Sequence, residues 1–247
     1  MAVFAERYPS DAKVVRMALG SAFVALFLGG LMGLIQALHR TGYLRIIDDS
    51  TYYTVLTLHG VALVLLFTIF FLVGFFHWAV VDSLDRTSES TRFTQLWYAL
   101  MSLGAAMSSV TILGGFVGEV DVSADVLYTF YTPLEAHPLF YAGLAMFLVG
   151  TWLAGVDWFR SWYNWKQNHG GERTPLRTFM VLTTMLMWYL ATFGVAAAIL
   201  VFILPWTLGL VDTVNPLLTR TLFWFFGHPV VYFWLMPAYM LWYVILP

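Results

Sequence analysis

The chain is poor in charged residues. Only 11% of its 247 residues are charged, whereas about 25% is usual for a soluble domain. Hydrophobic residues make up 60% of the chain, compared with about 45–50% in soluble domains. These proportions exclude a water-soluble globular fold, because such a fold needs more polar surface than this chain can provide.

The chain also contains no cysteine. This absence excludes disulfides, thiolate metal sites and iron-sulfur clusters held by this chain, so any metal must bind through His, carboxylate, Met or Tyr side chains. The net charge is only -2, from 12 basic and 14 acidic residues, and there is no basic tract. We therefore expect no nucleic-acid partner.

Long stretches without Asp, Glu, Lys or Arg dominate the sequence. A hydrocarbon core about 30 Å thick is crossed by about 20 apolar residues in a helix. Stretches of that length cover residues 17–39, 52–81, 93–117, 136–156, 178–211 and 221–247. The sequence therefore predicts an all-α polytopic membrane protein, with six transmembrane helices in a single membrane domain over residues 1–247.

The basic residues predict the orientation of this domain. One side would hold the amino-terminal segment and the loops after spans two and four, with Arg7, Lys13, Arg16, Arg86, Arg92, Arg160, Lys166, Arg173 and Arg177. The other side would hold only Arg40, Arg45 and Arg220, and its loop over 118–135 carries the acidic residues Glu119, Asp121, Asp125 and Glu135. Because basic residues near span ends stay on the cytoplasmic side, we predict a cytoplasmic amino terminus.

Two of the six histidines lie deep in predicted spans. The other four, His39, His77, His137 and His169, fall near span ends or in loops, which favours interfacial or loop roles. With a rise of about 1.5 Å per residue, His59 lies about 10 Å inside the bilayer and has no charged neighbour. Its position alone is compatible with a packing histidine or a cofactor ligand. The adjacent Gly60 would give a flat haem macrocycle room to approach.

The second deep histidine, His228, precedes Pro229. Since proline donates no backbone hydrogen bond and disturbs the preceding turn, we predict a bend in the helix at His228. Tyr232 is four residues further on and hence on the same face, one turn away. Tyr239 and Tyr243 extend this polar stripe. The alternative interpretation is an aromatic packing face.

Four segments together resemble a known family. They are the run from Arg220 to Pro247 with Gly-His-Pro-Val-Val-Tyr, the run Leu-Thr-Leu-His-Gly that ends at Gly60, Tyr-Thr-Phe-Tyr-Thr-Pro over 128–133, and Leu-Pro-Trp-Thr-Leu-Gly-Leu over 204–210. They resemble the amino-terminal half of catalytic subunit I of haem-copper oxygen reductases, most closely the B-type (cytochrome ba-type) branch. The His-Pro-x-Val-Tyr motif is highly specific to this family.

The resemblance implies a role for each residue that matches the motifs. His59 would be an axial ligand of the low-spin haem iron, and His228 one of three histidines on the active-site copper. Tyr232 would be catalytic together with His228: covalently joined to that histidine, it would donate an electron and a proton during cleavage of the O–O bond. Tyr232, Tyr239 and Tyr243 would form the proton path from the inside. The implied activity is that of a proton-pumping terminal oxidase, an enzyme that reduces oxygen to water.

Two single residues, Val230 and Tyr232, favour a branch of this family and a substrate. A-type relatives usually have Glu after His-Pro, at the end of a second proton path, whereas Val230 stands here; one proton path is therefore expected. Nitric oxide reductases of the superfamily lack the tyrosine, so Tyr232 favours oxygen as substrate. A nitric oxide reductase and a six-helix transporter are the alternatives. Transporters usually carry charged residues inside their spans, and the six stretches have none.

The number of helices in members of this family implies partners for this chain. Its members have at least twelve helices, and the other copper histidines, the high-spin haem ligand and the second low-spin haem ligand lie beyond the sixth helix. We expect a second polypeptide to supply the carboxy-terminal half, so that the chain is active only with it; the alternative is that this sequence is a fragment of a longer protein. Further expected partners are subunit II, through which electrons enter, a cytochrome c, copper-protein or quinol donor, and the lipid of a prokaryotic plasma membrane.

Overall fold

The fold is built from helices that run side by side. The computed structural model describes residues 2–43, 45, 47–117 and 122–246, and every regular element in these ranges is helical. In chain order they are α1 (Ala2–Arg7), α2 (Pro9–Arg40), α3 (Asp49–Gly60), η1 (Val61–Phe67), α4 (Thr68–Leu84), α5 (Thr91–Gly114), α6 (Pro138–Asn168), α7 (Leu176–Ala197), η2 (Ala198–Ile203), α8 (Leu204–Thr207), α9 (Pro216–Gly227) and α10 (Pro229–Ile245). The predicted all-α fold class is thus confirmed. Glu119 and Asp121 of the predicted outer loop lie outside the described residues.

Five helical stretches are long and apolar enough to cross a membrane. They are Pro9–Arg40, Asp49–Leu84, Thr91–Gly114, Pro138–Asn168 and Leu176–Thr207. The second and fifth contain short π-helical segments, η1 and η2, so each is one continuous helix built from several elements. These five stretches make the chain a membrane protein.

The sixth predicted span, 221–247, corresponds to α9 and α10. These helices have 12 and 17 residues and meet at His228, directly before Pro229, so no uninterrupted helix covers the predicted span. The interruption agrees with the predicted bend. The largest difference in helix bounds concerns the fourth span: α6 continues to Asn168, twelve residues beyond the predicted end at 156.

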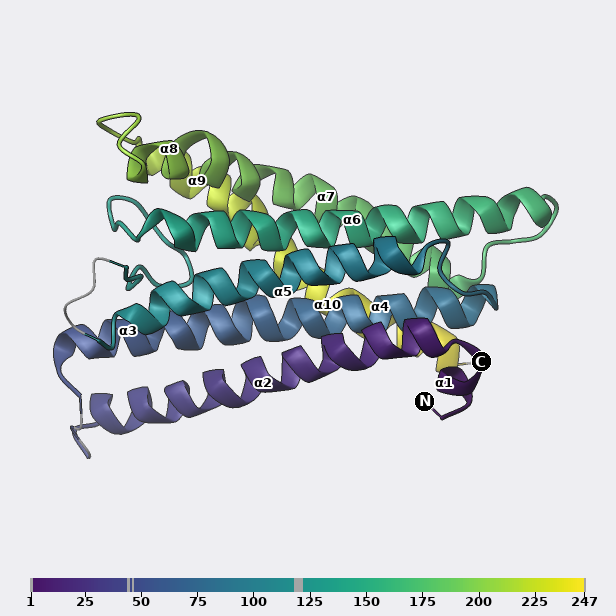
Figure 1. Cartoon of the computed structure of the whole chain (residues 1–247), viewed down its shortest axis with the longest axis horizontal. Helices are drawn as coiled ribbons and strands as arrows, with labels where there is room; N and C mark the ends of the chain where they lie inside the picture. Colours follow the sequence, from purple (N-terminus) through teal and green to yellow (C-terminus); the bar gives the residue numbers. More distant parts are fainter. Residues whose placement is uncertain (1, 44, 46, 118–121, 247) are drawn as a thin grey trace.

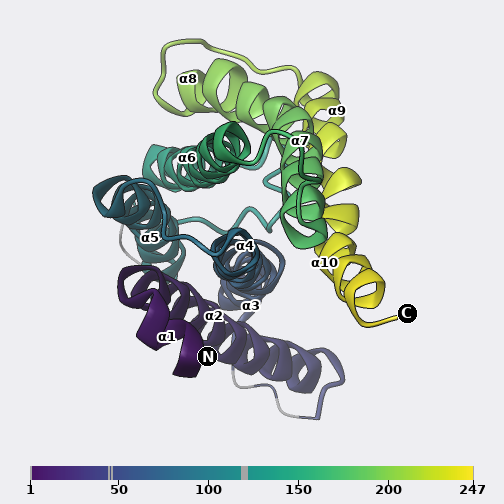
Figure 2. The same cartoon turned by 90° about the vertical axis from the view of Figure 1, so that its right-hand side faces the viewer.

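Successive loops lie at opposite ends of the bundle (Figure 1). The amino terminus, the turn between α4 and α5, and the loop between α6 and α7 lie at one end, and the carboxyl end of α10 lies there as well. The loops after α2, α5 and α8 lie at the opposite end. Viewed along the helices, α2, α5, α6 and α7 surround the centre, with α4 inside (Figure 2). This alternation matches the predicted topology, while the cytoplasmic location of the amino terminus remains a prediction.

Helices α5 and α6 touch through their backbones. A Cβ added at Gly104 would lie 2.5 Å from the carbonyl oxygen of Gly143, and one added at Gly143 would lie 2.5 Å from Oγ of Ser108. A Cβ at Gly150, two turns further along α6, would lie 2.9 Å from the backbone nitrogen of Met101. Small residues allow such close approach, and in a membrane the resulting van der Waals contact drives helix association.

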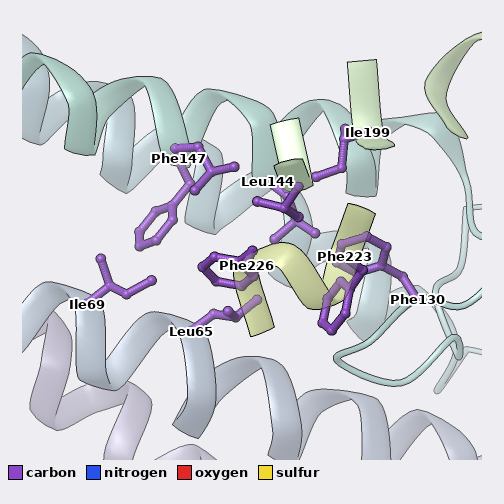
Figure 3. A pocket seen from close by; sticks show the side chains of 10 residues that line it. Leu65, Ile69, Phe130, Leu144, Phe147, Ile199, Phe223 and Phe226 are labelled. Atoms are coloured by element: carbon purple, nitrogen blue, oxygen red, sulfur yellow. The ribbon is translucent and has the colours of Figure 1, made fainter. Parts of the chain in front are cut away.

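Apolar side chains fill the centre of the bundle. A cavity of only about 20 Å³ remains there, lined by residues such as Leu65, Ile69, Phe147 and Phe226 (Figure 3). All ten lining residues are apolar, and a small cavity without polar partners stays dry. The centre is therefore a packed core, and candidate functional residues must be sought on the faces and at the ends of the bundle.

We expect Gly143→Ala to destabilise the protein by about 1–3 kcal/mol, because the new methyl group forces α5 and α6 apart. Denaturant unfolding of the purified protein measures this change. The matched control is Gly20→Ala on α2, where a Cβ would meet no atom within 4 Å. Equal stability of the two variants would contradict the backbone contact.

Candidate functional site

His59 stands at the carboxyl end of α3, held against α2. The helix begins with a cap, since the Asp48 carboxylate accepts a hydrogen bond from the backbone N–H of Thr51 at 2.7 Å. The half-buried imidazole places Nδ1 2.8 Å from the carbonyl oxygen of Gly29. A carbonyl only accepts, so Nδ1 carries a hydrogen, and in the neutral ring Nε2 then keeps its lone pair. Metal-ligating histidines typically show this pattern, in which a backbone carbonyl fixes the tautomer.

Two glycines of α2 allow this contact. A Cβ at Gly33 would lie 2.8 Å from Cε1 and 2.9 Å from Nδ1 of His59. A Cβ at Gly29 would lie 2.6 Å from the side chain of Leu63 in η1. The imidazole therefore lies directly on the backbone of α2, and its orientation is set by that helix. This arrangement fits a haem-ligating histidine whose free Nε2 is available to the iron.

The expectation for Gly60 is wrong. A Cβ at this position would lie 2.9 Å from Cβ of Tyr128, so the loop after α5 occupies the space beside Gly60. Burial raises the pKa of the Tyr128 hydroxyl, which fits the packing of this loop residue against α3. Gly60 makes room for the chain itself and not for a macrocycle.

A larger apolar groove lies near His59 but does not include it. The groove has a volume of about 490 Å³ and runs between α2, the α3–η1 helix and α5, with Leu58 and Ala62 among its lining residues. Its remaining lining is mostly Ala, Leu, Val, Ser and Phe side chains. Met32 is the one lining residue of a metal-binding type, and a single thioether does not make a metal site, so the groove is not a candidate metal site.

His228 and Tyr232 lie together. Helix α9 starts from a cap in which the Asn215 side chain accepts from the backbone N–H of Leu218 at 3.1 Å, and it ends at Gly227, directly before His228. Nε2 of His228 is 3.1 Å from the hydroxyl oxygen of Tyr232, and the ring centroids are 5.0 Å apart. The predicted placement of both side chains on one face, one turn apart, is thus confirmed.

One face of α9 and α10 is buried. Phe223, Phe226, Val230, Phe233 and Met240 follow each other at intervals of three, four and seven residues and are at most 3% exposed. They pack on the bundle; the Phe233 ring, for example, lies 4.1 Å from that of Trp188 on α7. This spacing is that of a single helix face, and the buried stripe therefore fixes how both helices are rotated.

The predicted polar stripe lies on an exposed face of the same helices. His228 is exposed, as are Tyr232 (48%), Tyr239 (37%) and Tyr243 (68%). Tyr239 contacts the ring of Trp242 at 5.5 Å. Neither Tyr239 nor Tyr243 makes a side-chain hydrogen bond to another described residue. The structure thus joins His228 to Tyr232, but it joins neither of them to Tyr239 or Tyr243.

His77 is the titratable residue that sequence reasoning misjudged. It is only 1% exposed, and its Nε2 lies 3.0 Å from Oδ1 of Asp11 on α2. Its Nδ1 accepts a hydrogen bond from Nε1 of Trp158 on α6 at 3.2 Å. Near this group, the buried Asp157 accepts hydrogen bonds from Thr94 at 2.8 Å and Trp97 at 3.1 Å. The only sequence signal was the pair of acidic residues just outside two predicted spans, one before span one and one after span four.

The amino-terminal segment, α1, contacts the turn between α4 and α5. Arg7 contacts Asp85 at 2.9 Å, and the Tyr8 hydroxyl donates to the same carboxylate at 2.5 Å. These two hydrogen bonds, with the positive charge of Arg7, hold the pKa of Asp85 below its usual value. Asp85 is therefore ionised at neutral pH and pairs with Arg7 at the end of α1.

No complete metal site occurs in the part of the chain that the structure describes: it contains no cluster of three or more His, Cys, Asp or Glu residues suited to a metal ion. His59 lies on α3 and His228 between α9 and α10, and each offers a single imidazole. The arrangement can therefore contribute ligands to a metal or cofactor that other residues must also hold.

Comparison with known proteins identifies relatives over nearly the whole chain. Residues 13–247 match the family described as cytochrome c and quinol oxidase polypeptide I. Cytochrome c oxidase subunit 1 of Thermus thermophilus is 37% identical over 98% of this chain. Quinol oxidase subunit 1 of Bacillus subtilis is 26% identical over 89% of the chain, and heme-copper oxidase subunit I+III of Aeropyrum pernix is 30% identical over 78%.

A solved structure shows the same arrangement. A chain of a heme-copper terminal oxidase dimer matches 93% of this chain with a TM-score of 0.86 and 36% sequence identity. The match covers 39% of that chain, and the Thermus thermophilus relative is covered over 43% of its length. The chain thus spans less than half the length of these relatives.

Proposed function

The chain belongs to the cytochrome c and quinol oxidase polypeptide I family, and we propose that it is the amino-terminal part of the catalytic subunit of a proton-pumping terminal oxidase that reduces oxygen to water. The observation that carries the proposal is the His228–Tyr232 pair, 3.1 Å apart on the exposed face of the interrupted sixth span, within a chain that matches the family over residues 13–247. The activity is that of the assembled protein, because this chain corresponds to 43% of its Thermus thermophilus relative.

The metal ligands follow from the two deep histidines. His59 would bind the iron of the low-spin haem through Nε2, since its Nδ1 is engaged by the Gly29 carbonyl. His228 would bind the active-site copper as one of several ligands, and the ligand of the high-spin haem would come from outside this chain. When bound, the haems and copper would supply electron transfer and the metal centre at which oxygen reacts.

Tyr232 would supply a hydrogen at the active site. Its hydroxyl lies within hydrogen-bonding distance of His228 and half of its side chain is exposed, so it can be reached from the face opposite the packed core. Tyr239 and Tyr243 follow on α10, whose carboxyl end lies at the end of the bundle that holds the amino terminus (Figure 1). We expect protons to reach Tyr232 along this face, with water or residues of the covering polypeptide bridging the hydroxyl groups.

Val230 supports assignment to the B-type branch. It replaces the Glu that is usual in A-type relatives, and it lies in the buried stripe at 3% exposure. A buried valine holds no proton, so a path ending here is not available and one proton path is expected.

The exposed face of α9 and α10 requires a cover. Besides the tyrosines it carries Trp224, Phe225, Leu235 and Trp242, each at least 41% exposed. We expect the carboxy-terminal half of polypeptide I to pack here and to complete both metal sites. The assembly would also include subunit II and receive electrons from a cytochrome c, a copper protein or a quinol, in the plasma membrane of a prokaryote.

The family match decides against the transporter alternative. Within the superfamily, Tyr232 continues to favour oxygen over nitric oxide as substrate. The first test of the proposal is a reduced-minus-oxidised optical spectrum of the purified complex together with a copper assay.

Tyr232→Phe should lower oxygen reduction by about 10²–10⁴-fold, the range expected when a positioned proton donor is removed, and leave the low-spin haem spectrum intact. Oxygen consumption by the purified complex measures the effect. Tyr163→Phe, at an exposed position of α6, is the matched control and should retain turnover. Normal turnover in the Tyr232 variant would reject its catalytic role.

His59→Ala should remove the low-spin haem signal from the difference spectrum, because the iron loses an axial nitrogen. His169→Ala, at the end of α6, removes an imidazole elsewhere and should leave the spectrum unchanged. An unaltered low-spin signal in the His59 variant would exclude His59 as the ligand.

Gly33→Ala tests whether α2 sets the orientation of the His59 ring. The added methyl group would lie 2.8 Å from the imidazole, so the ring must move and the low-spin haem signal should weaken or shift. Gly30→Ala, on the same helix with no atom within 4 Å of the new Cβ, should behave as the wild type. Identical spectra for both variants would show that the ring is not fixed by α2.

A further inference from the structure

Two carboxyl groups and one histidine form a buried acid cluster at the end of the bundle that holds the amino terminus. Asp11, His77 and Asp157 come from α2, α4 and α6, and each is only 1% exposed. None of them contacts His59, His228 or Tyr232. The proposed oxidase chemistry does not use this cluster, and its charge state can be worked out from the hydrogen bonds.

His77 is neutral in this arrangement. Nε1 of Trp158 lies 3.2 Å from Nδ1 of His77, and an indole N–H can only donate. Nδ1 must therefore carry a lone pair. The hydrogen of the ring is then on Nε2, which donates it to Oδ1 of Asp11 at 3.0 Å. The cluster contains no imidazolium, so His77 brings no positive charge to the two carboxyl groups.

Asp11 carries the negative charge of the cluster. Besides His77, the Thr87 hydroxyl donates to Oδ2 at 2.5 Å and the backbone N–H of Ser88 to Oδ1 at 3.4 Å. Both oxygens therefore accept hydrogen bonds. Asp11 also lies in the first turn of α2, where the helix dipole stabilises an anion. These donors and this position favour the ionised form.

Asp157 has a different environment. Both of its donors, the Thr94 hydroxyl and the Trp97 indole, are neutral and both bind Oδ2. Oδ1 is buried and meets no hydrogen-bond partner among the described residues. The titratable groups near enough to act on Asp157 are His77 and Asp11. A protonated His77 would favour ionisation of Asp157, but the hydrogen bond from Trp158 leaves the His77 ring neutral, so Asp11 supplies the charge. Among the residues that the structure describes, no cation forms an ion pair with Asp157, so a second buried anion here would be uncompensated and would be repelled by the first.

We propose that Asp157 is a proton-binding site and holds a proton in the folded protein, so that the cluster carries one negative charge, on Asp11. Both carboxyl groups are equally buried, and their different hydrogen-bond donors decide which one is ionised. The site is formed by α2, α4, α5, α6 and the turn between α4 and α5, and it does not depend on the haem and copper assignments.

Infrared spectroscopy of the purified complex tests this charge state. The difference spectrum between wild type and Asp157→Asn at neutral pH should show the loss of the C=O stretch of one protonated carboxyl group, and this band should shift after exchange into deuterium oxide. Asp11→Asn is the matched variant, and it should instead lose the two stretches of an ionised carboxylate. Loss of carboxylate stretches in Asp157→Asn would overturn the proposal.

Thermal unfolding gives a second readout. A neutral amide replaces a neutral acid at Asp157, so Asp157→Asn should assemble and unfold at nearly the wild-type temperature, whereas Asp11→Asn should unfold at a lower one. If Asp157→Asn fails to assemble or is the less stable of the two variants, the charge lies on Asp157 and the proposal is wrong.

Discussion

The candidate site depends on the burial of one face of α9 and α10. Phe226, Val230 and Phe233 pack against the bundle and thereby set the rotation of both helices. A helix has only one rotation about its axis, so this hydrophobic contact also determines where His228 and Tyr232 point. Packing of apolar side chains that take no part in the proposed reaction thus positions the two residues to which the reaction is assigned. His228, at the break before Pro229, remains exposed.

His59 is oriented by only a few contacts with α2. One carbonyl of α2 defines its tautomer, and one missing side chain, at Gly33, brings the ring against the backbone. The two deep histidines are therefore positioned in different ways. His59 is positioned by a polar contact with the neighbouring helix α2, and His228 by the rotation of α9 and α10 about their axes. In both cases the elements that position the ring come from this chain.

Local features of the sequence were sufficient for much of this structure. Apolar run lengths predicted the helices, and the four-residue spacing of His228 and Tyr232 predicted their contact, because both are properties of a single helix. Contacts between distant segments could not be read in this way. Gly60 was misjudged because Tyr128, far along the chain, folds back on it. His77 was misjudged because its partners Asp11 and Trp158 come from two other helices.

The dry cavity at the centre of the bundle has a consequence for charge movement. Its lining of leucine, isoleucine, valine and phenylalanine offers a proton no donor or acceptor, and about 20 Å³ leaves no space for a chain of water molecules. This part of the packed centre (Figure 3) is therefore a barrier to protons. A proton-pumping oxidase of the kind proposed above would need such a barrier, because any proton that leaked back through the bundle would dissipate the gradient that the enzyme builds.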